Sequence, residues 1–172
     1  MMKKKIDWDS IDFNDPDDFA PDTYTCFNCV SETDERIGYN EKQDLLKRAC
    51  SNCGIIYIED SKCNITLLEG EMRDWKAYLS EHLTFPFKAK VDEMSDAEAF
   101  GRPVPLRYHD DVTVVGISGD FDMYGIVVDV KKGQKEYTFP LCDLAVVAKK
   151  SPNYKLVDDY RDWDCNYRDR LD

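Results

Sequence analysis

Four of the seven cysteines have the spacing of a metal site. Cys26 and Cys29 form one C-x-x-C pair, and twenty residues separate it from a second pair, Cys50 and Cys53. Each C-x-x-C turn lets two sulfur atoms approach one ion, and two turns complete the tetrahedron of thiolates that structural zinc prefers. Four thiolates leave no open position for a reactive water, so the pattern predicts a structural Zn²⁺ and not metal-assisted hydrolysis. Redox sensing by the same thiols is the alternative.

The elements that must position these cysteines lie in residues 23–63, which we expect to fold as a zinc ribbon. Gly54 suits the tight turn behind a zinc-binding knuckle, and Ile55–Ile58 has the composition of a strand. Residues 41–48 favour a short helix by propensity. The ribbon has few large aliphatic residues, so we expect the metal to supply most of its folding free energy, on the order of 10 kcal/mol.

Signals for catalysis are weak elsewhere in the chain. His82 and His109 are its only two histidines, which restricts general acid-base and triad chemistry. Residues 116–119 lack the spacing of a nucleophile elbow. The sequence therefore predicts that the protein is not an enzyme, and an enzyme is the least favoured of three hypotheses.

Charge narrows the choice of partner. The chain carries 35 acidic and 23 basic side chains, a formal net charge of −12. This charge disfavours nucleic acid and anionic membranes and favours cations and basic proteins. The longest apolar run, residues 144–148, is far shorter than the roughly 20 residues that span a bilayer. Aspartates also stand where a signal peptide would be apolar. We therefore expect a cytoplasmic protein with no membrane or nucleic-acid partner.

A second type of metal site is indicated by the acidic residues. Eleven carboxylates lie between residues 91 and 143, mostly in predicted loops, against five Lys or Arg. Carboxylates that lie together repel one another, and a bound Ca²⁺ relieves that repulsion. The segment from Asp120 to Gly125 imitates the start of an EF-hand loop, but Lys131 stands where the bidentate glutamate would be, which excludes an EF-hand. An ordinary solvated acidic face is the alternative.

Residues 64–172 are expected to form a separate domain with a small antiparallel barrel. Apolar residues at steps of three and four predict a helix over about residues 70–83. The expected strands are Phe85–Val91, Asp111–Ile117, Tyr124–Val130, Lys135–Phe139 and Ala145–Ala148. An amphipathic helix should begin at Pro152 and close the domain. The fold class is therefore α+β, mainly β.

The first 22 residues differ in composition from the rest. They hold seven aspartates against three lysines, with Pro16 and Pro21 among them. This composition predicts an acidic, largely disordered tail. The alternative is that its aromatic residues dock onto one of the folded units.

Several motifs resemble those of the CcbP-type bacterial calcium-binding family. The motifs are Trp75-Lys-Ala-Tyr-Leu79, Leu83–Val91 with its Phe-Pro-Phe-Lys-Ala block, Val112–Val115, Asp120-Phe-Asp122, Gly125–Asp129, Phe139–Leu144 and Tyr160–Trp163. They cover about residues 70–165. The resemblance implies a Src-homology-3-like barrel flanked by helices, no catalysis, and reversible calcium binding by acidic loop residues. Lys88 and Lys90 depart from it, because similar proteins can carry acidic residues there.

On this resemblance we select four residues in matching loops as calcium ligands: Asp92, Glu93, Asp120 and Asp122. The leading hypothesis is a non-enzymatic calcium buffer or sensor that also holds a structural zinc ion. The alternative is a zinc-ribbon adaptor with no specific calcium role, whose acidic surface attracts a basic protein partner.

Overall fold

The structure, a computed structural model, describes residues 11–14, 23–121 and 123–168. The chain divides into two compact units, unit 1 (Met1–Met72 with Tyr167–Asp172) and unit 2 (Arg73–Asn166). The tail expected over residues 1–22 lies outside the described residues, apart from residues 11–14. In the described part of the chain, no helix has both the length and the apolar composition needed to cross a membrane.

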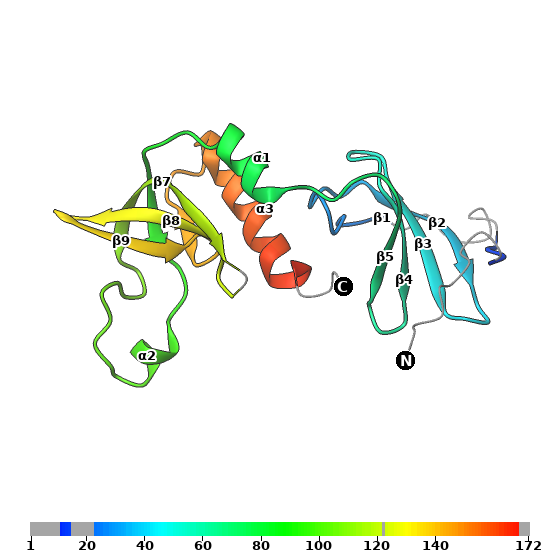
Figure 1. Ribbon diagram of the computed structural model, residues 1–172, viewed down its shortest axis with the longest axis horizontal. Helices are drawn as coiled ribbons and strands as arrows, with labels where there is room; N and C mark the ends of the chain where they lie inside the picture. The colour runs from blue at the N-terminus through cyan, green and yellow to red at the C-terminus, as the bar shows by residue number, and fades with distance from the viewer. Residues whose placement is uncertain (1–10, 15–22, 122, 169–172) are drawn as a thin grey trace. The chain divides into compact units, whose positions relative to one another are not determined.

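Unit 1 is built on a five-stranded antiparallel sheet in which each strand pairs with the next (Figure 1). The strands are β1 (Thr23–Tyr24), β2 (Asp34–Asn40), β3 (Leu45–Cys50), β4 (Ile56–Asp60) and β5 (Ile65–Glu69). The expected strand at Ile55–Ile58 is thus confirmed as part of β4. Because β5 pairs with β4, unit 1 continues to Met72 and does not end at Cys63, where the sequence suggested a boundary.

The helix predicted over residues 41–48 is wrong. Residues 41–44 form a turn, and β3 begins at Leu45. Hydrogen-bonded neighbours on both sides, β2 and β4, fix this segment as a central strand. Helix propensity is a weak preference that tertiary pairing overrides.

A buried polar group lies at the start of β2. Asp34 is fully buried and accepts a hydrogen bond from the hydroxyl of Tyr57. The guanidinium of Arg48, also buried, lies 3.8 Å from the Asp34 carboxylate. Burial raises the pKa of Asp34 to about 6, although the hydrogen bond from Tyr57 and the charge of Arg48 oppose that rise. Asp34 pairs with Cys50 in the sheet, so the group helps to fix the start of the second cysteine turn.

Unit 2 combines a second five-stranded antiparallel sheet with three helices (Figure 1). Its elements are α1 (Trp75–His82), β6 (Phe87–Val91), α2 (Asp96–Ala99), β7 (Asp111–Phe121), β8 (Gly125–Lys132), β9 (Lys135–Pro140), β10 (Leu144–Val146) and α3 (Pro152–Asn166). All five predicted strands and both predicted longer helices are present, so the α+β, mainly β class is confirmed. The sheet order is β10-β6-β7-β8-β9. Among the described residues no strand pair joins β9 to β10, and the expected closed barrel is therefore not formed.

Helix α3 is attached to this sheet by specific contacts. The amide of Ile126 on β8 donates to the hydroxyl of Tyr160 at 2.8 Å. The buried side chain of Asn153 bonds both the amide and the carbonyl of Thr84, at 3.0 and 2.7 Å. The rings of Trp75 and Tyr160 lie 5.8 Å apart, which packs α1 against α3. These contacts set the position of the acidic residues in the last turns of α3.

Candidate metal centres

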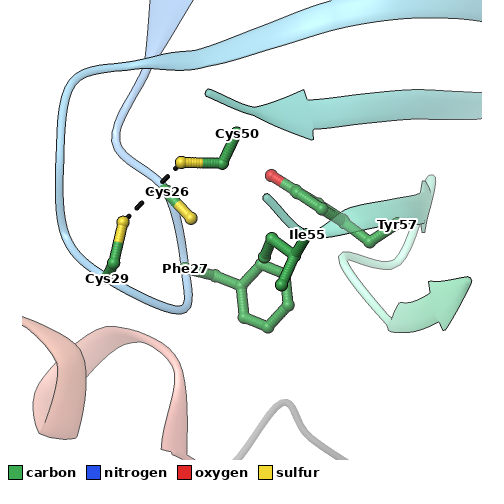
Figure 2. Close-up of a cluster of buried hydrophobic side chains, with 6 residues drawn as sticks. All are labelled: Cys26, Phe27, Cys29, Cys50, Ile55 and Tyr57. Carbon is green, nitrogen blue, oxygen red and sulfur yellow. Dashed lines mark hydrogen bonds between the residues drawn. The ribbon is translucent and has the colours of Figure 1, made fainter. Parts of the chain in front are cut away.

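The four predicted zinc ligands converge in unit 1. The sulfur atoms of Cys26, Cys29, Cys50 and Cys53 all lie within 4.8 Å of one another. The sulfur atoms of Cys29 and Cys50 lie 3.7 Å apart (Figure 2). Those of Cys26 and Cys53 lie 3.7 Å apart as well. A regular tetrahedron with metal–sulfur bonds of ~2.3 Å has sulfur–sulfur edges of ~3.8 Å. The donor set and its spacing therefore fit a tetrahedral Zn²⁺.

The two C-x-x-C turns have equivalent backbones. The amide of Val30 donates to the carbonyl of Cys26, and the amide of Gly54 donates to that of Cys50, both at 2.8 Å. Val30 and Gly54 both adopt positive φ, 57° and 74°. Glycine adopts this conformation without strain, and the sequence predicted the turn at Gly54 for that reason. In the first C-x-x-C turn, Val30 occupies the position that Gly54 has in the second. Valine rarely adopts positive φ, so its residue type does not predict a turn there.

A small apolar cluster surrounds the sulfurs. Phe27, Ile55 and Tyr57 are buried beside three of the cysteines (Figure 2). The rings of Phe27 and Tyr57 meet edge to face, with centroids 4.6 Å apart. These side chains exclude water from the site, which strengthens any interaction between the thiolates and a cation.

The thiols have different tendencies to ionise. Burial raises the pKa of Cys26 and of Cys53. Burial acts in the same direction on Cys50, but the hydroxyls of Thr33 and Ser31 and two backbone amides of the second knuckle outweigh it and lower the pKa to about 6. The charged form is therefore favoured most at Cys50, while the thiols of Cys26 and Cys53 need a cation to compensate their charge.

The four residues selected as calcium ligands occupy different parts of unit 2. Asp92 and Glu93 follow β6 directly. Asp120 is exposed on β7, where it pairs with Ile126 of β8. Asp122 lies outside the described residues. Asp92 and Glu93 are adjacent in the sequence, but their carboxylates have different partners, Arg161 for Asp92 and Asp143 for Glu93.

Two further acids form a chain of neighbours with Glu93. Glu93 is within hydrogen-bonding reach of Asp143, and Asp164 interacts with Asp143 by charge. We call Glu93, Asp143 and Asp164 the acidic cluster. Burial, followed by the negative charges of Glu93 and Asp164, raises the pKa of Asp143 to about 6, against a hydrogen bond from Cys142 that lowers it. The charged form of Asp143 is therefore disfavoured in the absence of a cation.

Asp164 could not be selected from the sequence. It lies on α3, where the hydroxyl of Tyr160 donates to its carboxylate at 3.0 Å. Its approach to residues 93 and 143 depends on the docking of this helix onto the sheet. The only sequence feature that could have indicated Asp164 is its position one turn after Tyr160 in the predicted closing helix.

Asp92 already has a basic partner. Its carboxylate accepts a hydrogen bond from Arg161 at 2.6 Å, and the same guanidinium donates to the carbonyl of Cys142 at 2.9 Å. Within the described ranges, no set of three carboxylates converges as closely as the four sulfurs do. The acidic side chains are therefore neighbours without yet forming a coordination sphere.

Comparison with known proteins gives a family for the second half of the chain. The family model Calci_bind_CcbP, described as calcium binding, matches residues 66–164. No curated protein matches the chain. A crystal structure of Anabaena CcbP is similar at 24% identity, covering 52% of this chain and 69% of that one, with a TM-score of 0.42. A calcium binding protein in its calcium-binding form is similar at 22% identity, covering 53% and 71%, with a TM-score of 0.41. The four converging cysteines precede the matched residues.

Proposed function

The chain belongs to the CcbP calcium-binding family, and on that premise we propose that unit 2 binds Ca²⁺ reversibly while unit 1 holds a structural Zn²⁺. The family match carries the calcium part of the proposal. The protein would act without catalysis, as a buffer or sensor of calcium on a Src-homology-3-like unit. The sheet order, in which the short last strand pairs with the first, is compatible with such a unit.

The acidic cluster is the best-supported calcium site in the described residues. Its three carboxylates come from separate elements, and the pKa of Asp143 is raised first by burial and then by repulsion from the negative charges of Glu93 and Asp164. A divalent cation removes this repulsion and gains hard oxygen ligands. The site thus gives a physical reason for calcium to bind unit 2.

Calcium takes six to eight oxygen ligands, so the cluster requires further donors. Asp92 is one, after its carboxylate exchanges Arg161 for the ion. Asp120 and Asp122 remain the predicted contribution of the β7–β8 hairpin. A chain of contacts leads from that hairpin to the cluster, since Asp120 pairs with Ile126 and Tyr160 bonds both Ile126 and Asp164.

Zinc is the metal that the four thiolates favour. Soft sulfur ligands in a tetrahedral arrangement select zinc and disfavour calcium, which requires oxygen. All four positions would be filled by protein, so the ion would stabilise unit 1 without a catalytic role. Metal analysis of the purified protein should find one zinc per chain, and the absence of zinc would remove this part of the proposal.

Calorimetric titration with calcium tests the first part. We expect one or more sites with a dissociation constant between ~10⁻⁷ and ~10⁻³ M. Asp143→Asn and Asp164→Asn should each weaken binding at least tenfold, because each removes a charged oxygen donor. Asp158→Asn is the matched control, since Asp158 lies exposed on the same helix α3. Equal affinities in all four proteins would contradict the assignment to the acidic cluster.

A protein-interaction role is the second candidate, and one surface favours it. Phe121, Met123 and Tyr124 are 55%, 76% and 56% exposed at the β7–β8 hairpin. Phe121 and Tyr124 line an open hollow of about 340 Å³ together with β8 and β9. Co-purification of one specific protein from calcium-free buffer, abolished by Phe121→Ser with calcium binding intact, would favour this role.

A further inference from the structure

The two cysteine turns have the same backbone conformation, and each also has an asparagine at the same position. Both have the sequence Cys-x-Asn-Cys, with Asn28 in the first and Asn52 in the second. Neither residue is a metal ligand. The structure nevertheless places both carboxamides against sulfur.

Asn28 connects a cysteine of each knuckle. Its backbone amide donates to Cys26 at 3.4 Å, and its side-chain amide donates to Cys53 of the opposite knuckle at 3.6 Å. The same nitrogen donates to the carbonyl of Glu71 at 3.2 Å. Since sulfur and carbonyl are both acceptors here, the amide nitrogen and not the amide oxygen must face them. Asn28 is only 2% exposed, so these hydrogen bonds form away from water.

Asn52 repeats this arrangement with the other two cysteines. Its backbone amide bonds Cys50 in its own knuckle. Its side-chain amide donates to Cys29 of the opposite knuckle at 3.4 Å. Asn52 is exposed, which is the main difference between the two asparagines.

The two asparagines therefore span two opposite edges of one tetrahedron. Asn28 spans the edge from Cys26 to Cys53, and Asn52 spans the edge from Cys29 to Cys50. Both edges cross from one knuckle to the other, and both measure 3.7 Å. Each asparagine thus bonds one sulfur of each knuckle, and together they reach all four sulfurs.

We propose that Asn28 and Asn52 are a matched pair of positioning residues, each of which clamps the two knuckles together by donating to one sulfur of each, and that they slow the release of the metal. The inference rests on the proposed zinc site. An N–H donor withdraws negative charge from a thiolate and so stabilises the dianionic complex of one Zn²⁺ with four thiolates. Because the bonds of Asn28 are shielded from water, its contribution exceeds that of Asn52.

Metal release from the full-length protein tests the pair. Zinc-loaded protein is mixed with excess chromogenic chelator, and the rate of zinc transfer is measured for wild type, Asn52→Ala, Asn52→Asp and Asn28→Ala. Ser51→Ala and Ser51→Asp are the matched controls, because Ser51 is the exposed neighbour in the same knuckle and bonds the carbonyl of Thr33, not sulfur. Ser51→Asp introduces the same charge as Asn52→Asp without removing a donor to sulfur.

We expect about tenfold faster release from both Asn52 variants and roughly 10- to 100-fold faster release from Asn28→Ala. The controls should stay within about twofold of wild type. Protein loaded with Co²⁺ supplies an independent readout. The sulfur-to-cobalt charge-transfer band should move to lower energy in the Asn52 variants, because a thiolate that has lost an N–H donor is more easily oxidised, and it should not move in the Ser51 variants.

The outcomes separate this inference from the zinc site itself. Asn52 lies on the surface, so its variants remain informative if Asn28→Ala fails to fold. Wild-type release rates and unshifted bands in both Asn52 variants would overturn the clamp and leave the zinc site in place. An equal band shift in Ser51→Asp would also overturn it, since general charge would then be the cause. Wild-type protein that takes up no zinc would overturn both.

Discussion

Replacing Asp143 with asparagine should stabilise unit 2 in calcium-free buffer at pH 7. The folded protein raises the pKa of Asp143 to about 6 from an ordinary value of 3.8. Each pKa unit corresponds to 1.36 kcal/mol, so ionising this carboxyl in the folded unit costs up to about 3 kcal/mol relative to the unfolded chain. Asparagine has nearly the same shape and carries no charge, and it should recover up to this amount.

The sign of the pH dependence follows from the direction of the shift. Because the folded pKa is the higher one, the protonated carboxyl stabilises the fold. That contribution is complete below about pH 4 and is lost as the pH rises through about 6. The substituted carboxamide is neutral throughout this range. The stability advantage of Asp143→Asn should therefore fall from up to about 3 kcal/mol at pH 7 toward zero near pH 4.

Urea unfolding followed by tryptophan fluorescence measures this effect. Trp75 and Trp163 both belong to unit 2, and Trp8→Phe in all proteins removes the one remaining tryptophan signal. Asp158→Asn, the exposed control on α3, should change stability by less than about 0.5 kcal/mol. If Asp143→Asn destabilises unit 2 at pH 7, or if its effect does not depend on pH, the folded unit does not raise the pKa of Asp143 as inferred.

Three further perturbations address the zinc site, the basic neighbour of the acidic cluster and the attachment of α3. Cys50→Ser removes the most acidic thiol, so the protein should retain no zinc on metal analysis and unit 1 should lose its near-ultraviolet circular dichroism. Arg161→Gln frees the Asp92 carboxylate and removes a nearby positive charge. Calorimetry should therefore show calcium binding that is tighter by about 1 kcal/mol. Weaker binding would mean that Arg161 holds Asp92 in place for the ion. Asn153→Ala deletes two hydrogen bonds to the Thr84 backbone and should cost about 2–3 kcal/mol in the urea unfolding of unit 2, whereas an unchanged midpoint would contradict the role given to this side chain.

Local patterns predicted most of the fold of unit 2. In β6, buried Phe87, Ala89 and Val91 alternate with exposed Lys88 and Lys90, and this alternation is visible in the sequence. A proline and its preceding serine likewise marked the start of α3. Such signals are contained within a few residues, so they are readable without knowing which strands will meet.

Long-range pairing is what the sequence did not reveal. Residues 41–48 contain good helix formers, yet pairing with β2 and β4 makes residues 45–48 part of a strand. Ile65–Glu69 falls in the second domain predicted over residues 64–172, but it completes the first sheet by pairing with β4. Closure of the barrel depends on the edges of the sheet, β9 and β10, and no local pattern specifies whether two edges meet.

The two candidate sites also differ in whether their residues are brought together locally or by long-range contacts. A C-x-x-C turn brings two ligands together within four residues, so the zinc ligands could be chosen by spacing alone. The acidic cluster joins residues 93 and 143, which the pairing of β6 with β10 brings close, to residue 164, which the docking of α3 adds. Composition could indicate that carboxylates were abundant there, but it could not distinguish a ligand from a surface charge.

The two proposed sites also differ in how completely the protein forms them before an ion binds. The sulfurs of unit 1 already lie at tetrahedral spacing, with opposite edges of 3.7 Å. Zinc can therefore bind there with little rearrangement and should dissociate slowly, which suits a structural ion. The carboxylates of the acidic cluster do not converge as the sulfurs do, so part of the calcium binding energy must be used to bring them together. Unit 2 should consequently release calcium readily, and dialysis into calcium-free buffer should remove calcium while one zinc per chain remains. Loss of both metals together would show that the thiolate site is no better organised in advance than the acidic one.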